Sequence, residues 1–254
     1  MSDEHLLVTG SSGAIGGAIA RALRRRHPAA RLTLLDVVEA PSRALADALG
    51  GDVGVVPCDL ADPAAALRAV DDARARFGPV SGLVNCAGFM EVRRFDQIPW
   101  TRAAELLAVD LVSPLAIMRA VVDDMTAARR GFIVNVASMA GKVTLPGCAF
   151  YGAAKAGLSM ASEIARRELA GSGIHVLTVY PGAVASALEA RARDQYGRTL
   201  VTRLVPTGDP DVLAAKIVGA LDARRARVVY PSLYALGLLG IANPIALAFG
   251  PRAH

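Results

Sequence analysis

A short apolar run ends in the turn Thr9-Gly10-Ser11-Ser12-Gly13-Ala14-Ile15-Gly16, and a helical pattern begins inside that turn. Glycines let backbone N–H groups approach a bound anion closely, and the amino end of a helix favours negative charge. Alone, such a turn is a weak signal, because many glycine-rich turns are ordinary loops. Its place between a strand pattern and a helix pattern favours a pyrophosphate site. The predicted contacts are Gly10, Ser12, Gly13, Ala14, Ile15 and Gly16.

Outward from this turn, strand and helix patterns alternate along the chain. Short runs rich in Val, Leu and Ile predict seven buried strands at His5–Thr9, Arg31–Asp36, Val53–Pro57, Val80–Asn85, Phe132–Ala137, Ile174–Tyr180 and Arg227–Tyr230. Helical patterns lie between them at Ile15–Arg26, Pro41–Leu49, Pro63–Phe77, Trp100–Ala128, Ala149–Ala170 and Pro210–Arg224. Strands separated by helices build a doubly wound parallel sheet. The sequence therefore predicts a single α/β domain of the Rossmann type over residues 1–254.

Ligands of such a sheet bind outside the carboxyl ends of its strands. Asp36 ends the second strand, where an acid accepts hydrogen bonds from a ribose 2′-hydroxyl and repels a 2′-phosphate. Val37 and Val38 follow, so no arginine stands ready for a phosphate, and NAD is favoured over NADP. A surface acid at a strand end is the alternative interpretation of Asp36.

Asp59 and Leu60 follow the third strand and are predicted to contact the cofactor. Asp59 would accept a hydrogen bond from the adenine amine. In the other interpretation, Asp59 or Asp62 caps the next helix. The sequence leaves both interpretations open.

Tyr151 and Lys155 are four residues apart in a predicted helix, so their side chains share one face. A tyrosine has a pKa near 10, and a nearby ammonium lowers that pKa toward the range that acid–base catalysis needs. Ser138 stands thirteen residues before Tyr151, just after the fifth strand, where its hydroxyl could hold a substrate oxygen as charge develops. The alternatives are a core tyrosine with a surface lysine, and a serine that bonds locally.

These motifs together resemble the shorter, single-domain members of the short-chain dehydrogenase/reductase family. The matching segments are Thr9–Gly16, Asn85-Cys86-Ala87-Gly88, Ser138, Tyr151 with Lys155, and Pro181-Gly182-Ala183-Val184-Ala185-Ser186. The resemblance covers nearly the whole chain. Each motif alone is common, whereas the set in this order is highly specific.

The resemblance implies hydride transfer between NAD(H) and an alcohol or ketone. Tyr151 would then be the general acid or base, Lys155 would bind the nicotinamide ribose and lower the Tyr151 pKa, and Ser138 would orient the substrate oxygen. Further cofactor contacts are implied at Asn85, Ala87, Gly88, Tyr151, Lys155, Pro181, Gly182, Val184 and Ser186. Relatives are homodimers or homotetramers, so a homo-oligomer is expected.

The sequence departs from the family pattern at three positions. Ala14 stands where shorter members carry the middle glycine of the turn, and Ser186 replaces a threonine while keeping the hydroxyl. Asp110 stands in the long middle helix where the family has an asparagine that completes a proton relay to the lysine. An ionised Asp110 would offset part of the Lys155 charge and weaken its hold on Tyr151. A relay role and an ordinary helix residue both remain open for Asp110.

Composition excludes several other functions. The net charge is +5, but the arginines are dispersed, so solvated surface is favoured over a nucleic-acid site. The three cysteines form no Cys-x-x-Cys pair and the four histidines have no ligand spacing, so neither a disulfide framework nor a metal site is expected. There is no Gly-x-Ser-x-Gly motif of the kind that hydrolases use.

Two segments bear on the substrate. Residues 186–206 have no strand pattern, and in relatives this region forms a lid over the substrate. Its arginines would either lie in solvent or meet an acidic substrate group: Arg191, Arg193, Arg198 and Arg203. The apolar tail over residues 228–254 carries no charge from Val228 to Pro251. It would wall a pocket, pack in an oligomer interface or contact a membrane surface, while its prolines argue against a full span.

The apolar tail favours an apolar secondary alcohol or ketone as the small-molecule substrate. The acidic start of the chain has no basic region or long apolar segment, so no signal peptide is expected. A cytoplasmic protein, with possible membrane association through the tail, is therefore predicted. A dinucleotide-binding protein with little or no catalysis is the alternative function; Ser138, Tyr151 and Lys155 argue against it, and Asp110 leaves room for it.

Overall fold

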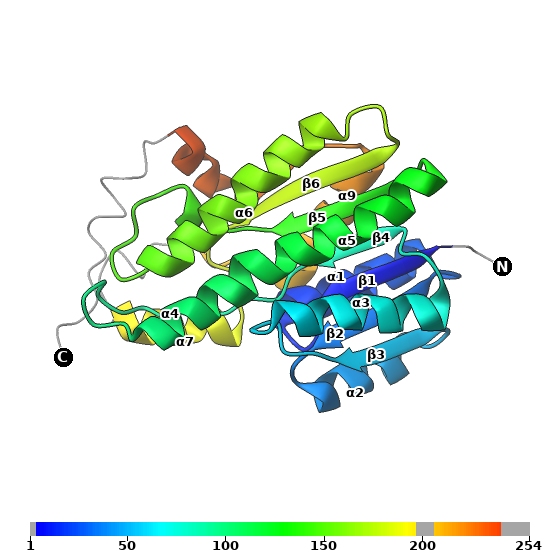
Figure 1. Ribbon diagram of the computed structural model, residues 1–254. Coiled ribbons are helices and arrows are strands. Elements are labelled where there is room, and N and C mark those ends of the chain that lie inside the picture. The colour runs from blue at the N-terminus through cyan, green and yellow to red at the C-terminus, as the bar shows by residue number, and fades with distance from the viewer. Residues whose placement is uncertain (1–3, 197–205, 240–254) are drawn as a thin grey trace.

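Seven parallel strands form one sheet in the order β3-β2-β1-β4-β5-β6-β7. The computed structural model describes residues 4–196 and 206–239. The strands are β1 (His5–Thr9), β2 (Arg31–Asp36), β3 (Val53–Pro57), β4 (Gly82–Asn85), β5 (Gly131–Val136), β6 (Ile174–Pro181) and β7 (Arg227–Tyr230). The chain winds outward from β1 in one direction and then from β4 in the other (Figure 1). This topology confirms the predicted doubly wound sheet of the Rossmann type.

Helices cover both faces of the sheet (Figure 1). One face carries α1 (Ala14–Arg26), α2 (Glu39–Leu49) and α9 (Pro210–Asp222). The other carries α3 (Pro63–Phe77), α5 (Ser113–Ala128) and α6 (Ala149–Glu168). The remaining elements are α4 (Trp100–Leu107), η1 (Ala108–Val112), η2 (Met139–Gly141), α7 (Ala187–Tyr196) and η3 (Ser232–Leu239).

Two apolar cores result from the alternation of side chains along each strand. In β1, Leu6 and Val8 pack with α1 and α9, whereas Leu7 packs with α3 and α5. All three side chains are almost fully buried. A strand covered on both faces must be apolar throughout, which is why these strands were recognisable as continuous apolar runs.

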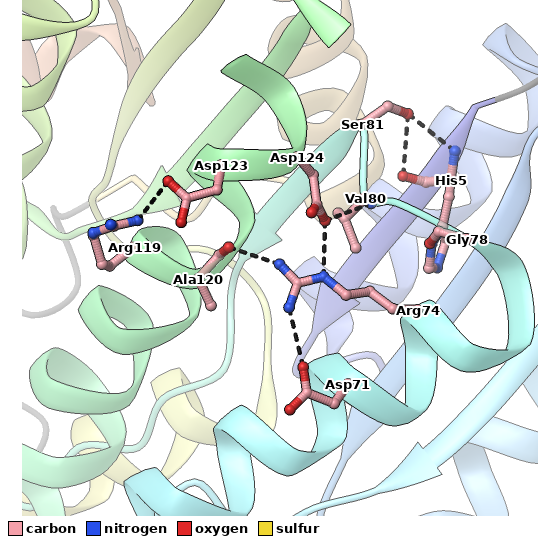
Figure 2. A network of polar contacts seen from close by, with 10 residues as sticks. All are labelled: His5, Asp71, Arg74, Gly78, Val80, Ser81, Arg119, Ala120, Asp123 and Asp124. Atoms are coloured by element: carbon pink, nitrogen blue, oxygen red, sulfur yellow. Dashed lines mark hydrogen bonds and ion pairs between the residues drawn. The ribbon is translucent and has the colours of Figure 1, made fainter. Parts of the chain in front are cut away.

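Polar contacts connect the elements at the amino edge of the sheet, where the strands begin (Figure 2). The guanidinium of Arg74 on α3 donates to Asp124 on α5 at 2.9 Å and to the carbonyl of Ala120 at 2.7 Å. Asp124 also accepts from the backbone N–H of Val80, just before β4. These contacts join α3, α5 and the start of β4 at the edge opposite the strand ends where ligands bind.

Several predicted elements differ from the structure by one or two residues at an end, and two segments differ more. The predicted helix Trp100–Ala128 is divided into α4, the π-helical η1 and α5. Pro114 in the first turn of α5 has no N–H to bond to the carbonyl of residue 110, so the regular helical ladder is interrupted there. The segment without strand pattern after Ser186 contains the helix α7, which the sequence analysis did not assign.

Candidate active site

Tyr151 and Lys155 lie one turn apart on α6, and both are buried. The Lys155 ammonium is 5.8 Å from the centre of the Tyr151 ring and donates to the carbonyl of Val136, at the end of β5, at 3.3 Å. The helix therefore carries both side chains to the carboxyl edge of the sheet.

Ser138 reaches the same place from β5. It stands between β5 and η2, where its hydroxyl accepts a hydrogen bond from the N–H of Ala140 at 3.1 Å. Hydrogen bonding by the Ser138 side chain also helps to lower the pKa of Tyr151. The structure thus brings together the three residues that the sequence analysis proposed for acid–base chemistry.

Asp110 joins this group through a buried ion pair. Its Oδ1 is 2.9 Å from Lys155 Nζ, and the Asp110 side chain is 0% exposed. The N–H of Phe89 points to its other oxygen at 3.4 Å. The structure places Asp110 against Lys155, and a relay role for Asp110 stays a prediction.

The pKa values of the three titratable side chains reflect this burial. Burial raises the pKa of Tyr151, and the charge of Asp110 raises it further. Lys155 and Ser138 lower this pKa, but only partly offset the rise. Burial would lower the pKa of Lys155, but Asp110 and Tyr151 together raise it. Burial likewise raises the pKa of Asp110, against the effect of Lys155. The expected lowering of the Tyr151 pKa by Lys155 is therefore present but is outweighed.

The glycine-rich turn connects β1 to α1. Gly10 has a φ of +71°, and a Cβ there would lie 2.7 Å from the backbone of Ala87. A Cβ at Gly16 would overlap the carbonyl oxygen of Gly10. Gly10 thus allows the turn to pack against the loop after β4, and Gly16 allows α1 to begin close to the turn itself.

The turn leaves the amino end of α1 open toward solvent. Its N-cap, Gly13, provides no side-chain hydrogen bond, and no acidic residue lies in the first helical turn. Ser12, Gly13 and Ala14 are exposed. Free N–H groups at a helix terminus without an internal cap fit the phosphates of a dinucleotide. Ala14 in place of a glycine does not block this arrangement.

Asp36 lies beside the same turn. One carboxylate oxygen accepts from the N–H of Ser12 at 2.8 Å, and the other accepts from the N–H of Val38 at 2.9 Å. Each oxygen keeps a second lone pair for a further donor. Asp36 therefore holds the shape of the turn and places a negative charge next to the predicted phosphate site.

Asp62, rather than Asp59, is the cap of α3. Its carboxylate accepts from the N–H of Ala64 at 2.9 Å. Asp59 is exposed and accepts from the N–H of Ala61. Leu60 is buried in the core between β2 and α3. An adenine contact of Asp59 or Leu60 stays a prediction.

Thr9 is a positioning residue that the sequence analysis did not single out. Its hydroxyl accepts from the N–H groups of Cys86 and Ala87, at 3.0 and 3.1 Å. Thr9 thereby ties the turn after β1 to the Asn85–Gly88 turn after β4. A polar residue at the end of an apolar strand was the available signal.

Asn85 is buried and bonded within the fold. Its amide donates to the carbonyl of Pro114 at 3.1 Å and to Asn135 Oδ1 at 2.8 Å, and Asn135 donates to Ser162. These contacts link β4, β5, α5 and α6 behind the site. Asn135 and Ser162 were not predicted as site residues, because the sequence shows them only as polar residues within apolar patterns.

The Pro181–Ser186 segment leaves β6 toward the site. The ring of Tyr234, in η3, covers Gly182, where a Cβ would lie 2.5 Å from the ring. Val184 is buried and pairs with Gly208 in a parallel bridge. The Ser186 hydroxyl accepts from the N–H of Glu189 in α7. The described part of the apolar tail therefore packs on a predicted cofactor-binding segment; residues 240–254 lie outside the described residues.

Helix α7 lies over an apolar cluster that contains Tyr151. Ala192 and Tyr196 of α7 pack there with Val92 and Leu106, as well as with Tyr151 itself. The Tyr196 hydroxyl donates to the carbonyl of Pro146 at 2.7 Å and lies 3.0 Å from Cys148 Sγ. A lid over the substrate at residues 186–206 stays a prediction, and residues 197–205 lie outside the described residues.

The arginines of the lid differ in their surroundings. Arg191 is exposed, whereas Arg193 pairs with Glu189 and donates to Thr207. Arg198 and Arg203 lie outside the described residues. Within residues 4–196 and 206–239, no group of His, Cys, Asp or Glu side chains could hold a metal ion. In the same ranges, no helix is long and apolar enough to cross a membrane.

The fold and the position of these residues define an α/β protein with a nucleotide-type site at the carboxyl edge of its sheet. The family model described as short chain dehydrogenase matches residues 4–197. The chain therefore belongs to the short-chain dehydrogenase/reductase family, and it is an oxidoreductase of that family.

Several known proteins resemble the chain over most of its length. A D-threitol dehydrogenase from Mycolicibacterium smegmatis is 35% identical over 218 residues, which are 84% of this chain and 83% of that protein. A 3-oxoacyl-[acyl-carrier-protein] reductase from Escherichia coli is 33% identical over 205 residues, 80% of this chain and 82% of that protein. A short-chain dehydrogenase from Streptomyces avermitilis has a similar structure, with a TM-score of 0.82 and 25% identity over 97% of this chain and 95% of that one.

Proposed function

We propose that the protein transfers hydride between NAD(H) and an apolar secondary alcohol or ketone, with Tyr151 as the general acid and base. The observation that carries this proposal is the convergence of Ser138, Tyr151 and Lys155 at the carboxyl edge of the sheet. The family supplies the coarser statement, since its members use a nicotinamide dinucleotide and act on small molecules.

Each of the three side chains has a role that its position supports. The Tyr151 hydroxyl exchanges a proton with the substrate oxygen. Ser138, which acts on the pKa of Tyr151, holds that oxygen where the proton is transferred. Lys155 stays charged beside Tyr151 and binds the ribose next to the nicotinamide. The nicotinamide, when bound, supplies or accepts the hydride.

The preference for NAD rests on Asp36, whose carboxylate borders the open amino end of α1. We expect Asp36→Ala to raise the affinity for NADPH relative to NADH about tenfold, because a like charge next to the 2′-phosphate is removed. The ratio of the two dissociation constants, measured by fluorescence, checks this. Asp59→Ala, at the end of the neighbouring strand, is the control and should leave the ratio unchanged. An unchanged ratio in Asp36→Ala would count against NAD selection by this residue.

The apolar substrate is supported by the cluster around Tyr151, which is built of aliphatic and aromatic side chains. A panel of apolar ketones and small polar alcohols tests this part of the proposal. Equal turnover of both kinds of compound would remove it. We also propose that the protein forms a homodimer or homotetramer, which analytical sedimentation can check. We further propose that the apolar tail contacts a membrane surface, which a vesicle-binding assay can check.

A dinucleotide-binding protein without catalysis is the second candidate function. Asp110 in place of the usual asparagine favours this second function. One relative, from Xanthobacter autotrophicus, is named inactive 2-(S)-hydroxypropyl-CoM dehydrogenase 2 and is 32% identical over 222 residues. Binding and turnover of NADH and NADPH separate the two functions. Turnover that is lost in Tyr151→Phe, while NADH still binds, supports the enzyme. NADH binding without turnover of any compound supports the binding protein, and no binding of either nucleotide would overturn both.

A further inference from the structure

The Asp110–Lys155 pair places a full negative charge beside the cation that faces Tyr151. Asp110 Oδ1 and Lys155 Nζ are 2.9 Å apart, and their side chains are 0% and 5% exposed. Protonating the carboxylate would leave a buried ammonium without an opposite charge, which is costly. An ionised pair, whose net charge is zero, avoids this cost.

No other charge among the described residues compensates for Asp110 near the phenol. Besides Lys155 on α6 and Asp110 on η1, the groups that act on Tyr151 are Ser138 after β5 and Cys148 before α6. Cys148 is buried against the Tyr196 hydroxyl of α7, and burial raises the pKa of its thiol to about 11. Cys86, after β4, acts on Lys155, and burial raises the pKa of that thiol to about 12. Both thiols are neutral at physiological pH.

A buried phenol beside a neutral ion pair has little to stabilise its phenolate. An uncompensated ammonium would favour the phenolate. Here the attraction of Lys155 is opposed by the repulsion of Asp110 from the adjacent helix. Tyr151 is therefore held in the protonated form well above neutral pH.

We propose that Asp110 is a positioning residue that sets the pH range of each direction, so that the protein reduces carbonyls at neutral pH and oxidises alcohols only in alkaline solution. This inference rests on the proposed function, because Tyr151 must exchange the proton. In reduction, Tyr151 gives its proton to the carbonyl oxygen while the carbonyl carbon receives the hydride of NADH, and solvent returns a proton to the phenolate. In oxidation, the phenolate takes the hydroxyl proton while the hydride leaves the same carbon for NAD.

The ionisation of Tyr151 can be measured without turnover. Protein labelled with ¹³C at the tyrosine ring carbon that bears oxygen is titrated by NMR, and the Tyr151 signal is identified by its loss in Tyr151→Phe, since the chain has five tyrosines. The midpoint is compared in the wild type and in Asp110→Asn. Asp123→Asn is the matched control, since it removes one carboxylate of α5 whose partner, Arg119, lies on the surface (Figure 2).

We expect the Tyr151 midpoint to fall by about one pH unit or more in Asp110→Asn and to stay unchanged in Asp123→Asn. Alcohol oxidation at pH 7 should then rise about tenfold in Asp110→Asn, with the alkaline limb of carbonyl reduction moving to lower pH. Equal midpoints in the wild type and Asp110→Asn, or equal shifts in both variants, would overturn the proposal.

Two further outcomes distinguish failure of this inference from failure of the proposed function. If Asp110→Asn does not fold, the wild type decides alone: a Tyr151 midpoint below about 9 contradicts the inference, and a higher one supports it. If no compound is turned over, the proposed function fails and the inference about direction fails with it. The titration then still reports whether Asp110 controls the ionisation of Tyr151.

Discussion

Gly88 is the backbone position against which the Asp110–Lys155 pair packs. A Cβ at this position would overlap Asp110 Oδ1 and lie 3.1 Å from Lys155 Nζ. Neither side chain can move far, because both are buried. The glycine after β4 therefore leaves room for the Asp110–Lys155 pair, besides its predicted contact with the cofactor.

Replacing Gly88 by alanine should reduce turnover about tenfold or more, because the pair must shift and Lys155 with it. Gly219→Ala is the control: Gly219 lies in α9 with nothing near its Cβ position, so alanine there should stabilise the fold by about 0.5–1 kcal/mol. Steady-state kinetics and thermal unfolding of both variants check this. Wild-type turnover in Gly88→Ala would show that the pair tolerates displacement.

At the scale of elements, the π-helical segment η1 explains how Asp110 reaches Lys155. Pro114 lies four residues after Asp110, where its missing N–H and its ring disturb the carbonyl of residue 110. The helix widens over Ala108–Val112, and Asp110 is its buried residue. π-Helical bulges often occur at functional sites because they re-aim one side chain.

Pro114→Ala should therefore shift the pH dependence of turnover without lowering stability. Alanine restores the hydrogen bond of the helical ladder and allows regular pitch, which turns Asp110 away from Lys155. We expect an unchanged or higher melting temperature, several-fold faster alcohol oxidation at pH 7 and a pH profile shifted to lower pH, as for Asp110→Asn. Pro210→Ala, at the first position of α9 where proline is well tolerated, is the control and should keep wild-type turnover. Unchanged kinetics in Pro114→Ala would show that Pro114 does not position Asp110 beside Lys155.

The elements also show what a sequence can predict here. Strands β1, β2, β3 and β7 and helix α3 have the predicted bounds, since buried parallel strands are apolar and Asp62–Pro63 marks a helix start. Helix α7 was not assigned because it is mostly polar and is held by Tyr196 and Gln195, which contact distant loops. The Asp110–Lys155 contact was not predictable in detail, because it depends on how η1 and α6 cross.

At the scale of the whole molecule, the carboxyl and amino edges of the sheet have different roles. The carboxyl edge gathers the turns after β1, β2, β4, β5 and β6 into the candidate site, as sheet topology requires. The general location of the site was therefore predictable from the order of strands and helices. The amino edge is held together by contacts such as Arg74–Asp124. These two residues are fifty positions apart, so no sequence pattern predicts their contact.

His5, at the amino edge, makes the stability of the whole molecule depend on pH. Its Nδ1 donates to the carbonyl of Gly78 at 2.8 Å, so the neutral ring accepts from the Thr33 hydroxyl at Nε2, also at 2.8 Å. Burial lowers the pKa of His5, with a further contribution from Arg31. Protonation would place a charge in the core and replace an accepting nitrogen with a second donor.

Because the folded state disfavours the protonated ring, the unfolded chain binds more protons as the pH falls below about 6.5. The free energy of unfolding should be highest above that pH and should decrease below it, by at most about 1.4 kcal/mol per pH unit from this residue. Urea unfolding of the wild type and of His5→Gln at pH 8 and pH 5 measures the effect. His175, whose pKa burial also lowers, is common to both proteins, so the difference between them isolates His5. We expect the variant to be the less stable protein at pH 8 and the gap to narrow at pH 5; a constant gap would show that His5 is not the titrating group.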